Sequence, residues 1–419
     1  MPDYIHIEVE QEQSSKKAGM PCGDVVQSRR TNWGTTVVCA DGIGSGIRAH
    51  IAAEMCAARI FTAISEGRSF RKVFSSVAAT MQQCRDPQKP FAAFSLARIR
   101  PDGNATILTY DAPLPILVSR TEATALATRP FPLPGGLAAE SNIQLECGEG
   151  ILLMSDGITQ AGIGYAGNSE WTTEGVVRFV NECLASQTGY SAIPAKIHRE
   201  AKMRWSGHFN HGKASEILRN AAHHFSPYVP DRVHQVQVPY SHKVAGDDCT
   251  VVLAYCRNGQ TVNILTGPPR DRNTDTAVVK KFMDAHGLKI VCGGTTSKLV
   301  SKYLDVPLEM IQNSGSDIVP PRYDIKGISL VTEGAVTLNQ VYNIIDEDLD
   351  KLDEDSCVTE LRLLLNVADR VNFIVGLADN RANDDISFRQ RGVLSRNVLI
   401  PLLVEKLSKE GKLVNVEYV

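Results

Sequence analysis

Acidic side chains stand at four separated places where a strand-like run meets a glycine or a second acid. They are Asp24 in Cys-Gly-Asp, Asp41 in Ala-Asp-Gly-Ile-Gly, Asp156 in Ser-Asp-Gly-Ile, and Asp247 with Asp248 in Gly-Asp-Asp-Cys-Thr. A strand that ends in Asp-Gly places its carboxylate at the rim of a sheet. The glycine lets the backbone approach an ion closely and offer its carbonyl oxygen as a ligand. The spacing therefore predicts a set of carboxylates at one sheet edge.

Carboxylates that converge in this way repel one another, and a divalent cation would stabilise them. A site built from oxygen ligands alone suits Mg²⁺ or Mn²⁺ and not zinc. Two such ions about 3.5 to 4 Å apart could bridge a water, lower its pKa and place it in line with a phosphorus atom. The chemistry that these residue types favour is metal-assisted hydrolysis of a phosphoester.

The plain alternative is that Asp-Gly pairs are only turns, because both residues are frequent there. Asp102-Gly103, within Pro-Asp-Gly, is expected to be such a turn, between two strands of a hairpin. The other acidic motifs differ, since Asp41 and Asp156 each follow a run that has the composition of a buried strand. Their repetition along the chain favours the metal site.

The elements that must position these acids can be outlined from the hydrophobic pattern. Residues 35–40 form a β-branched run that ends at Asp41, and a glycine-rich turn leads into a helix over residues 47–63. A second amphipathic helix is predicted over 69–84. Further strands are predicted at 5–9, 91–98, 105–110, 114–118, 123–128, 142–146, 151–155 and 250–255.

Composition excludes several classes of protein. The 419 residues are 43% hydrophobic and 22% charged, with a formal net charge of -3, which is typical of soluble globular protein and indicates two or three domains. This charge gives no general attraction to nucleic acid or to anionic membranes. No window approaches about 18 consecutive apolar residues, so no membrane span is expected.

The N-terminal residues and the cysteines favour the cytoplasm. The first residues carry Asp, Glu and Gln and lack the basic start and apolar core of a signal peptide. Ten cysteines are scattered without a CxxC pair, which favours reduced thiols over disulfides or a zinc site. A stretch over about 162–245 is helical in pattern and rich in His. Its spacings fit no recognised set of metal ligands, which favours solvated helix faces and loops.

A second domain is predicted over residues 259–419, after a first domain over 1–258. Residues 267–274 are typical of a linker or exposed loop, and helix and strand signals then alternate as in an α/β domain with a mostly parallel sheet. After a strand over 288–292, the turn Gly293-Gly294-Thr295-Thr296 precedes a predicted helix over 298–304 and could hold an anion. It matches neither Gly-x-x-x-x-Gly-Lys nor Gly-x-Gly-x-x-Gly. A ligand sensor, a regulatory docking module and a homodimerisation module all stay open.

From about Gly23 to Cys256 the chain resembles the metal-dependent protein phosphatase (PPM) family, and more closely its branch typified by stage II sporulation protein E. The most specific piece is Ala-Asp-Gly-Ile-Gly-Ser-Gly-Ile-Arg-Ala-His at 40–50, with the other acidic motifs in order. The resemblance implies an α+β fold, an α-β-β-α sandwich of two antiparallel sheets. It implies that Asp41 bridges two Mn²⁺ or Mg²⁺ ions or more, and that the Gly42 carbonyl binds one. It also implies that Asp24, Asp156 and Asp247 complete the centre, with Asp248 less firmly assigned.

The same resemblance implies a substrate and a mechanism. The substrate would be phosphoserine or phosphothreonine on a protein, hydrolysed by a metal-activated water. Arg29 and Arg30 are candidates for a phosphate-binding role, with a solvated turn as the alternative. His50 is either a general acid or a helix-packing residue. Two other functions stay open: a non-catalytic phosphatase fold, and a hydrolase of nucleotides or small phosphoesters directed by the C-terminal domain.

Overall fold

The computed structural model describes residues 4–83, 91–133, 136–163, 170–206, 246–312, 322–349, 352, 356–378 and 393–419. The chain divides into two compact units. One, the sandwich unit, comprises Ile7–Arg29 and Gly34–Arg257. The other, the parallel-sheet unit, comprises Met1–His6, Arg30–Trp33 and Asn258–Val419.

Two antiparallel sheets form the centre of the sandwich unit. One has the order β1-β11-β10-β6-β7 and the other β2-β3-β4-β5-β9-β8. The strands of the first are β1 (Ile5–Ser14), β11 (Cys249–Asn258), β10 (Gly150–Met154), β6 (Ile116–Val118) and β7 (Ala123–Ala125). Those of the second are β2 (Asp24–Thr31), β3 (Gly34–Gly42), β4 (Ala92–Ile99), β5 (Asn104–Tyr110), β9 (Gly136–Gln144) and β8 (Arg129–Leu133). The turn at Asp102-Gly103 joins β4 to β5, as predicted, with Gly103 at φ 81°.

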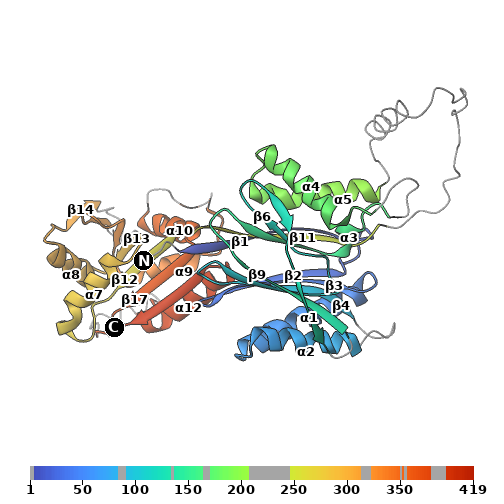
Figure 1. Ribbon diagram of the computed structural model, residues 1–419. Coiled ribbons are helices and arrows are strands. Elements are labelled where there is room, and N and C mark those ends of the chain that lie inside the picture. The colour runs from blue at the N-terminus through green and yellow to red at the C-terminus, as the bar shows by residue number, and fades with distance from the viewer. Residues whose placement is uncertain are drawn as a thin grey trace, which may run out of the picture. The chain divides into compact units, whose positions relative to one another are not determined.

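Helices cover the outer face of each sheet. Helices α1 (Ile47–Ser65) and α2 (Phe70–Gln83) lie on the six-stranded sheet, and α4 (Thr172–Ala185) and α5 (Ile193–Trp205) lie on the five-stranded one (Figure 1). The short helices α3 (Asp156–Thr159) and η1 (Tyr190–Ala192) connect the elements on that side. The unit is therefore the predicted α-β-β-α sandwich.

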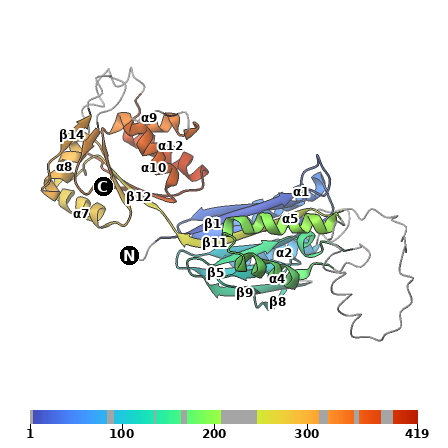
Figure 2. The same cartoon turned by 90° about the horizontal axis from the view of Figure 1, so that it is seen from above.

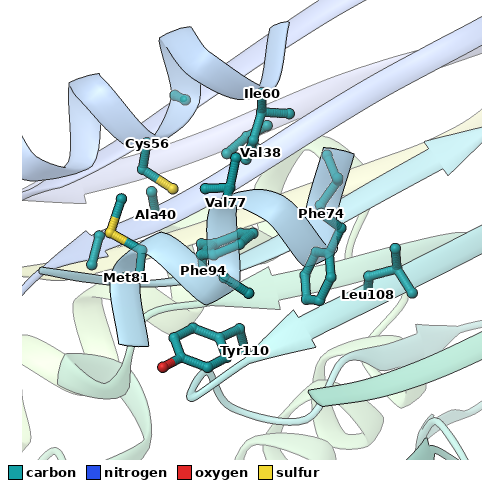
Figure 3. Close-up of a cluster of buried hydrophobic side chains, with 14 of the residues drawn as sticks. Val38, Ala40, Cys56, Ile60, Phe74, Val77, Met81, Phe94, Leu108 and Tyr110 are labelled. Atoms are coloured by element: carbon teal, nitrogen blue, oxygen red, sulfur yellow. The ribbon is translucent and has the colours of Figure 1, made fainter. Parts of the chain in front are cut away.

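Apolar side chains hold α1 and α2 against their sheet. Phe74 of α2 packs against Phe94 of β4, with ring centroids 5.0 Å apart, and the ring of Tyr110 of β5 lies 5.9 Å from that of Phe94 (Figure 3). Burial of one such ring contributes roughly 1.5 to 3 kcal/mol. Small residues of α1, such as Ala53 and Ala57, are fully buried and let this helix lie close to β3.

The parallel-sheet unit has seven strands in the order β14-β15-β16-β13-β12-β17-β18. Five pair in parallel, and β14 and β15 add antiparallel pairs at one edge. The bounds are β12 (Thr261–Thr266), β13 (Leu288–Cys292), β14 (Glu309–Gln312), β15 (Arg322–Asp324), β16 (Leu330–Thr332), β17 (Arg370–Val375) and β18 (Leu413–Tyr418). An α/β domain with a mostly parallel sheet is therefore present.

Helices cover both faces of this sheet. One face carries α7 (Asp275–Asp284) and α8 (Gly294–Leu304), and the other carries α9 (Ala335–Ile344), α10 (Cys357–Val367) and α12 (Arg396–Lys409) (Figure 2). The single turn η2 (Arg272–Thr274) precedes α7. This winding on two faces gives the sheet a defined carboxyl edge.

Some elements differ from the prediction. The central strand β12 and the strand β2 carry no predicted element, and α8 begins at Gly294 rather than at residue 298, so the predicted turn is the first turn of the helix. Residues 267–274 were predicted as a linker or exposed loop. Residues 270–274 are exposed, as predicted for a loop, whereas Gly267 and Pro269 directly after β12 are buried. The six His of the predicted insert beyond residue 206 lie outside the described residues. The cysteines within the described ranges are free, and no helix described there is both long and apolar enough to cross a membrane.

Candidate metal centre

The strand pairing brings the acidic motifs to one end of the two sheets. Asp24 opens β2 and Asp41 lies at the end of β3, which precedes α1. Asp156 follows β10, and Asp247 precedes β11, the strand that pairs with β10. The carboxyl group of Asp41 lies close enough to Asp24 and Asp156 for the charges of both to raise its pKa. Residues more than 200 positions apart in sequence are thus neighbours.

Burial makes this gathering of acids electrostatically unfavourable. Burial raises the pKa of Asp24 to about 6, although the hydroxyls of Ser155 and Thr250 act to lower it. The pKa of Asp41 is well above its ordinary value, because of burial first and then the charges of Asp24 and Asp156. The pKa of Asp156 is raised mainly by burial, with a further contribution from the charge of Asp247.

The surroundings of Asp24 indicate most clearly that the site binds a cation. The residue is 2% exposed, and neither carboxylate oxygen accepts a hydrogen bond of good geometry within the described part of the chain. A buried carboxylate without a counter-charge costs several kcal/mol, of the order of the penalties seen for unpaired buried ions. Hard cations bind such oxygens, so the chemistry of these side chains fits Mg²⁺ or Mn²⁺.

Two glycines let the backbone close around the acids. A Cβ on Gly42 would lie 1.9 Å from the carbonyl oxygen of Ala49, so only glycine permits α1 to approach β3 here. A Cβ on Gly157 would lie 1.9 Å from the carbonyl oxygen of Asp248. Glycine in both Asp-Gly pairs is therefore a packing requirement of the site and not only a turn preference.

The two adjacent acids Asp247 and Asp248 have different surroundings. Asp248 is buried and its oxygens accept backbone hydrogen bonds from Lys16 at 2.5 Å and Gly23 at 3.0 Å. Asp247 is partly exposed, and its Oδ1 lies 3.6 Å from Lys16 Nζ. Asp248 therefore anchors the segment before β2, while Asp247 faces the other acids.

The sequence did not single out several residues that support the acids. Gln160 Nε2 donates to Asp156 Oδ2 at 3.0 Å, and Trp205 Nε1 of α5 donates to the Gly157 carbonyl at 2.8 Å. Lys16 lies beside Asp247, as described above. Gln160 is four residues after Asp156 and could have been found from helical spacing. Lys16 and Trp205 lie far from the motifs in sequence, so no local signal marks them.

The structure places the predicted basic residues elsewhere. Arg29 lies near the far end of β2 from Asp24, roughly 16 Å along an extended strand, and its guanidinium stacks over Phe61 at 4.7 Å. Arg30 belongs to the parallel-sheet unit, where it contacts His6 and donates to the Gly411 carbonyl. His50 Nδ1 lies 2.9 Å from the carbonyl oxygen of Cys22, as a packing residue would.

The predicted ligand loop at Gly293–Thr296 lies in the parallel-sheet unit. Gly293 adopts φ 127° before α8, and its N–H donates to the carbonyl of Thr332 at 2.9 Å. Thr296 is buried, whereas a Cβ on Gly294 would meet no atom within 4 Å. Thr295 is exposed in the first turn of the helix. The start of α8 is thus partly open.

An α-β-β-α sandwich with carboxylates gathered at one end of its sheets is the architecture of metal-dependent protein phosphatases. Residues 31–211 match the family model described as stage II sporulation protein E (SpoIIE), so this part of the chain is similar to that branch of the metal-dependent phosphatases. No curated protein matches the chain.

Several solved structures are similar at low sequence identity. The RsbU and RsbW domains of Rv1364c from Mycobacterium tuberculosis are 15% identical with a TM-score of 0.42, over 67% of this chain and 68% of that one. The phosphatase domain with part of the regulatory domain of SpoIIE from Bacillus subtilis is 14% identical with a TM-score of 0.43, over 62% and 65%. RsbX in complex with magnesium is 16% identical with a TM-score of 0.36, over 60% and 99%. Because these TM-scores are low, the fold assignment depends on the strand pairings described above.

Proposed function

We propose that the protein is a metal-dependent protein serine/threonine phosphatase whose centre binds two or more Mn²⁺ or Mg²⁺ ions. The observation that carries the proposal is the meeting of Asp24, Asp41 and Asp156 in a buried place. Burial raises the pKa of all three, the charges of Asp24 and Asp156 raise that of Asp41 further, and both oxygens of Asp24 lack a hydrogen-bond partner among the described residues. A fold does not keep such an arrangement for stability, because each unpaired buried carboxylate opposes folding. Perturbed carboxylates of this kind are typical of functional sites.

Some residues of the centre are proposed to bind the ions, and others to orient the residues that do. Asp24, Asp41, Asp156 and Asp247, with the Gly42 carbonyl, are the proposed ligands. When bound there, divalent ions would lower the pKa of a water and neutralise charge on the phosphoryl oxygens. Gln160 orients Asp156 through its hydrogen bond at 3.0 Å.

Asp248 is proposed as a positioning residue and not as a ligand. Its two carboxylate oxygens accept hydrogen bonds from the backbone N–H groups of Lys16 and Gly23. Both donors precede Asp24 in the chain, and Gly23 is its direct neighbour. These bonds fix the segment that leads into β2. Lys16 Nζ, beside Asp247, supplies positive charge at the same place and is a candidate to contact a substrate phosphate.

The proposed substrate is a phosphorylated protein, since the family acts on such substrates. The complete set of acids argues against a non-catalytic member, which would have no need to keep them. Location in the cytoplasm and formation of a homodimer stay predictions of the sequence.

Turnover of a phosphoserine peptide and of p-nitrophenyl phosphate by the full chain tests the proposal. Hydrolysis is expected with Mn²⁺ and not with EDTA. Asp156→Asn should reduce kcat about a thousandfold, which corresponds to roughly 4 kcal/mol of lost transition-state stabilisation. Asp102→Asn, at the exposed hairpin turn, should keep wild-type activity.

Three outcomes would contradict the assignment. Peptide binding without phosphate release would support the non-catalytic alternative. Release of phosphate from nucleotides alone would support the small-phosphoester alternative. Undiminished turnover by Asp156→Asn would remove this carboxylate from the mechanism.

A further inference from the structure

The parallel-sheet unit contains a point at which the winding of its chain reverses. From β12 the chain moves outward to β13 and β16 with α7 and α8 on one face, and then returns to β17 and β18 with α9, α10 and α12 on the other. The reversal lies between the adjacent parallel strands β12 and β17. Connections that leave two neighbouring strands for opposite faces open a crevice at their carboxyl ends, where open α/β sheets bind ligands.

The backbone at this edge is tightly held and rich in glycine. Gly376, after β17, donates its N–H to the carbonyl of Thr266 at 2.9 Å, and the N–H of Ala378 donates to Pro268 at 3.2 Å. A Cβ on Gly267, after β12, would lie 1.1 Å from Nη1 of Arg396. The guanidinium of Arg396, the first residue of α12, therefore occupies the space that a side chain at 267 would take.

Arg396 is half-buried, and its described contacts include a backbone carbonyl but no acid. Its Nη2 donates to the carbonyl of Ala378 at 3.0 Å, and among the residues with described positions no carboxylate forms an ion pair with it. Two other arginines of this unit are paired, Arg322 with Glu360 at 3.0 Å and Arg362 with Glu410 at 3.1 Å. An arginine stays charged, so a half-buried guanidinium without an acidic partner among the described residues would be stabilised by a bound anionic ligand.

A buried hydroxyl at the same place also lacks a partner. Thr266 is 1% exposed, and its Oγ1 makes no hydrogen bond within the described structure. By strand alternation it shares a face of β12 with Val262 and Ile264, which pack toward α9 and α12. Thr266 therefore presents its hydroxyl on the side from which Arg396 enters.

The N-termini of the neighbouring helices α8 and α9 differ, because a carboxylate side chain caps α9 and no described side chain caps α8. At α9, Oε2 of Glu333 accepts from the N–H of Val336 at 3.2 Å, so a carboxylate already occupies that N-terminus. At α8, after the adjacent strand β13, no side chain caps the helix and its first turn has no acid. Its free N–H groups add positive partial charge to the same edge of the sheet.

We propose that the carboxyl edge between β12 and β17 binds a phosphate-bearing small molecule, with Arg396 as the anchor of the phosphate. The Thr266 hydroxyl is a second donor, and the open start of α8 lies on the path along which the rest of the ligand extends. The arginine fork matches phosphate oxygens in pairs, which favours this class over a simple halide. This binding is separate from the acidic centre and does not depend on its proposed activity.

Calorimetric titration of the full chain in EDTA tests the proposal, because removal of divalent ions prevents phosphate from being held at the acidic centre. The probes are inorganic phosphate, AMP, ADP, NAD and, without phosphate, adenosine. At least one phosphate-bearing probe should bind to a single saturable site, and adenosine should bind at least tenfold more weakly than AMP. Arg396→Gln should weaken binding by about 10- to 100-fold, as expected for loss of charge-assisted hydrogen bonds.

Two variants keep the result interpretable. Lys409→Gln removes a charge from the exposed other end of α12, where Lys409 pairs with Glu405 at 2.7 Å, and should bind as wild type does. Thr266→Val keeps the shape of the strand, should fold, and should weaken binding by about threefold to tenfold. If no phosphate-bearing probe binds, or adenosine binds as well as AMP, the proposal is wrong. Wild-type affinity in both Arg396→Gln and Thr266→Val would also overturn it.

Discussion

At the scale of single residues, the same dipeptide does two different things in this chain. Asp102 in its Asp-Gly pair is exposed and accepts the N–H of Asn104 at 3.0 Å, as a turn residue does. Asp41 and Asp156, in their Asp-Gly pairs, lie close enough that the charge of Asp156 raises the pKa of Asp41. The preceding apolar strand distinguishes the two cases in sequence, so Asp41 and Asp156 could be predicted from it. The anchoring role of Asp248 could not, because it depends on backbone groups about 230 residues away.

The repulsion between the acids leads to a prediction about the metal-free protein. The folded pKa of Asp41 is raised above its unfolded value, so its charge opposes folding at every pH above the unfolded pKa. At pH 7, Asp41→Asn should therefore raise the free energy of unfolding in EDTA by about 1 to 2 kcal/mol, the usual size of a single-residue effect. Urea unfolding measures this, with Asp102→Asn as the unchanged control. A less stable Asp41→Asn protein in EDTA would show that the acids do not repel.

At the scale of elements, the close approach of α1 to β3 positions the centre. A Cβ at Gly42 would overlap the Ala49 backbone, and a backbone atom cannot move aside as a side chain can. Gly42→Ala should therefore cost about 2 to 3 kcal/mol of stability and reduce turnover, since α1 must shift away from Asp41.

Gly189→Ala, at a glycine that precedes η1 and lies outside the acidic centre, is the control for the same substitution. Gly189 has φ -63° and open space around its Cβ position, so alanine there should change stability by no more than about 0.5 kcal/mol. Urea unfolding and turnover of p-nitrophenyl phosphate compare the two variants. Equal stability and activity in Gly42→Ala and Gly189→Ala would mean that the approach of α1 is unimportant.

The strands that precede Asp41 and Asp156 were predictable because an apolar run leads directly into each Asp-Gly pair. The central strand β12 could not be predicted from the sequence, because polar residues interrupt its apolar run. Its Asn263 is satisfied only in the folded sheet, where Asn372 donates to it at 2.9 Å and it donates to the His286 carbonyl at 2.8 Å. Asn415 extends this row of amides across β17 and β18. A strand whose polar groups are paired by distant strands has no local signature.

At the scale of the whole molecule, the two units interleave in the sequence. Met1–His6 and Arg30–Trp33 cluster with Asn258–Val419, although they flank and interrupt the first strands of the sandwich. Tyr4 illustrates this, since its carbonyl accepts the N–H of Gly259 at 2.7 Å. No compositional change marks these short segments, because only tertiary contacts assign them. Each unit nevertheless has its own candidate site. The sandwich unit has the acids, and the parallel-sheet unit has Arg396, which pairs with no carboxylate among the residues that the structure describes.

The central claim is that carboxylates from four segments of the chain hold divalent cations. Anomalous diffraction from crystals of the full chain grown with Mn²⁺ tests it most directly. Peaks are expected among Asp24, Asp41, Asp156 and Asp247, and the peaks should weaken or vanish in Asp156→Asn. An intact sandwich with no anomalous density among these four side chains would contradict the account.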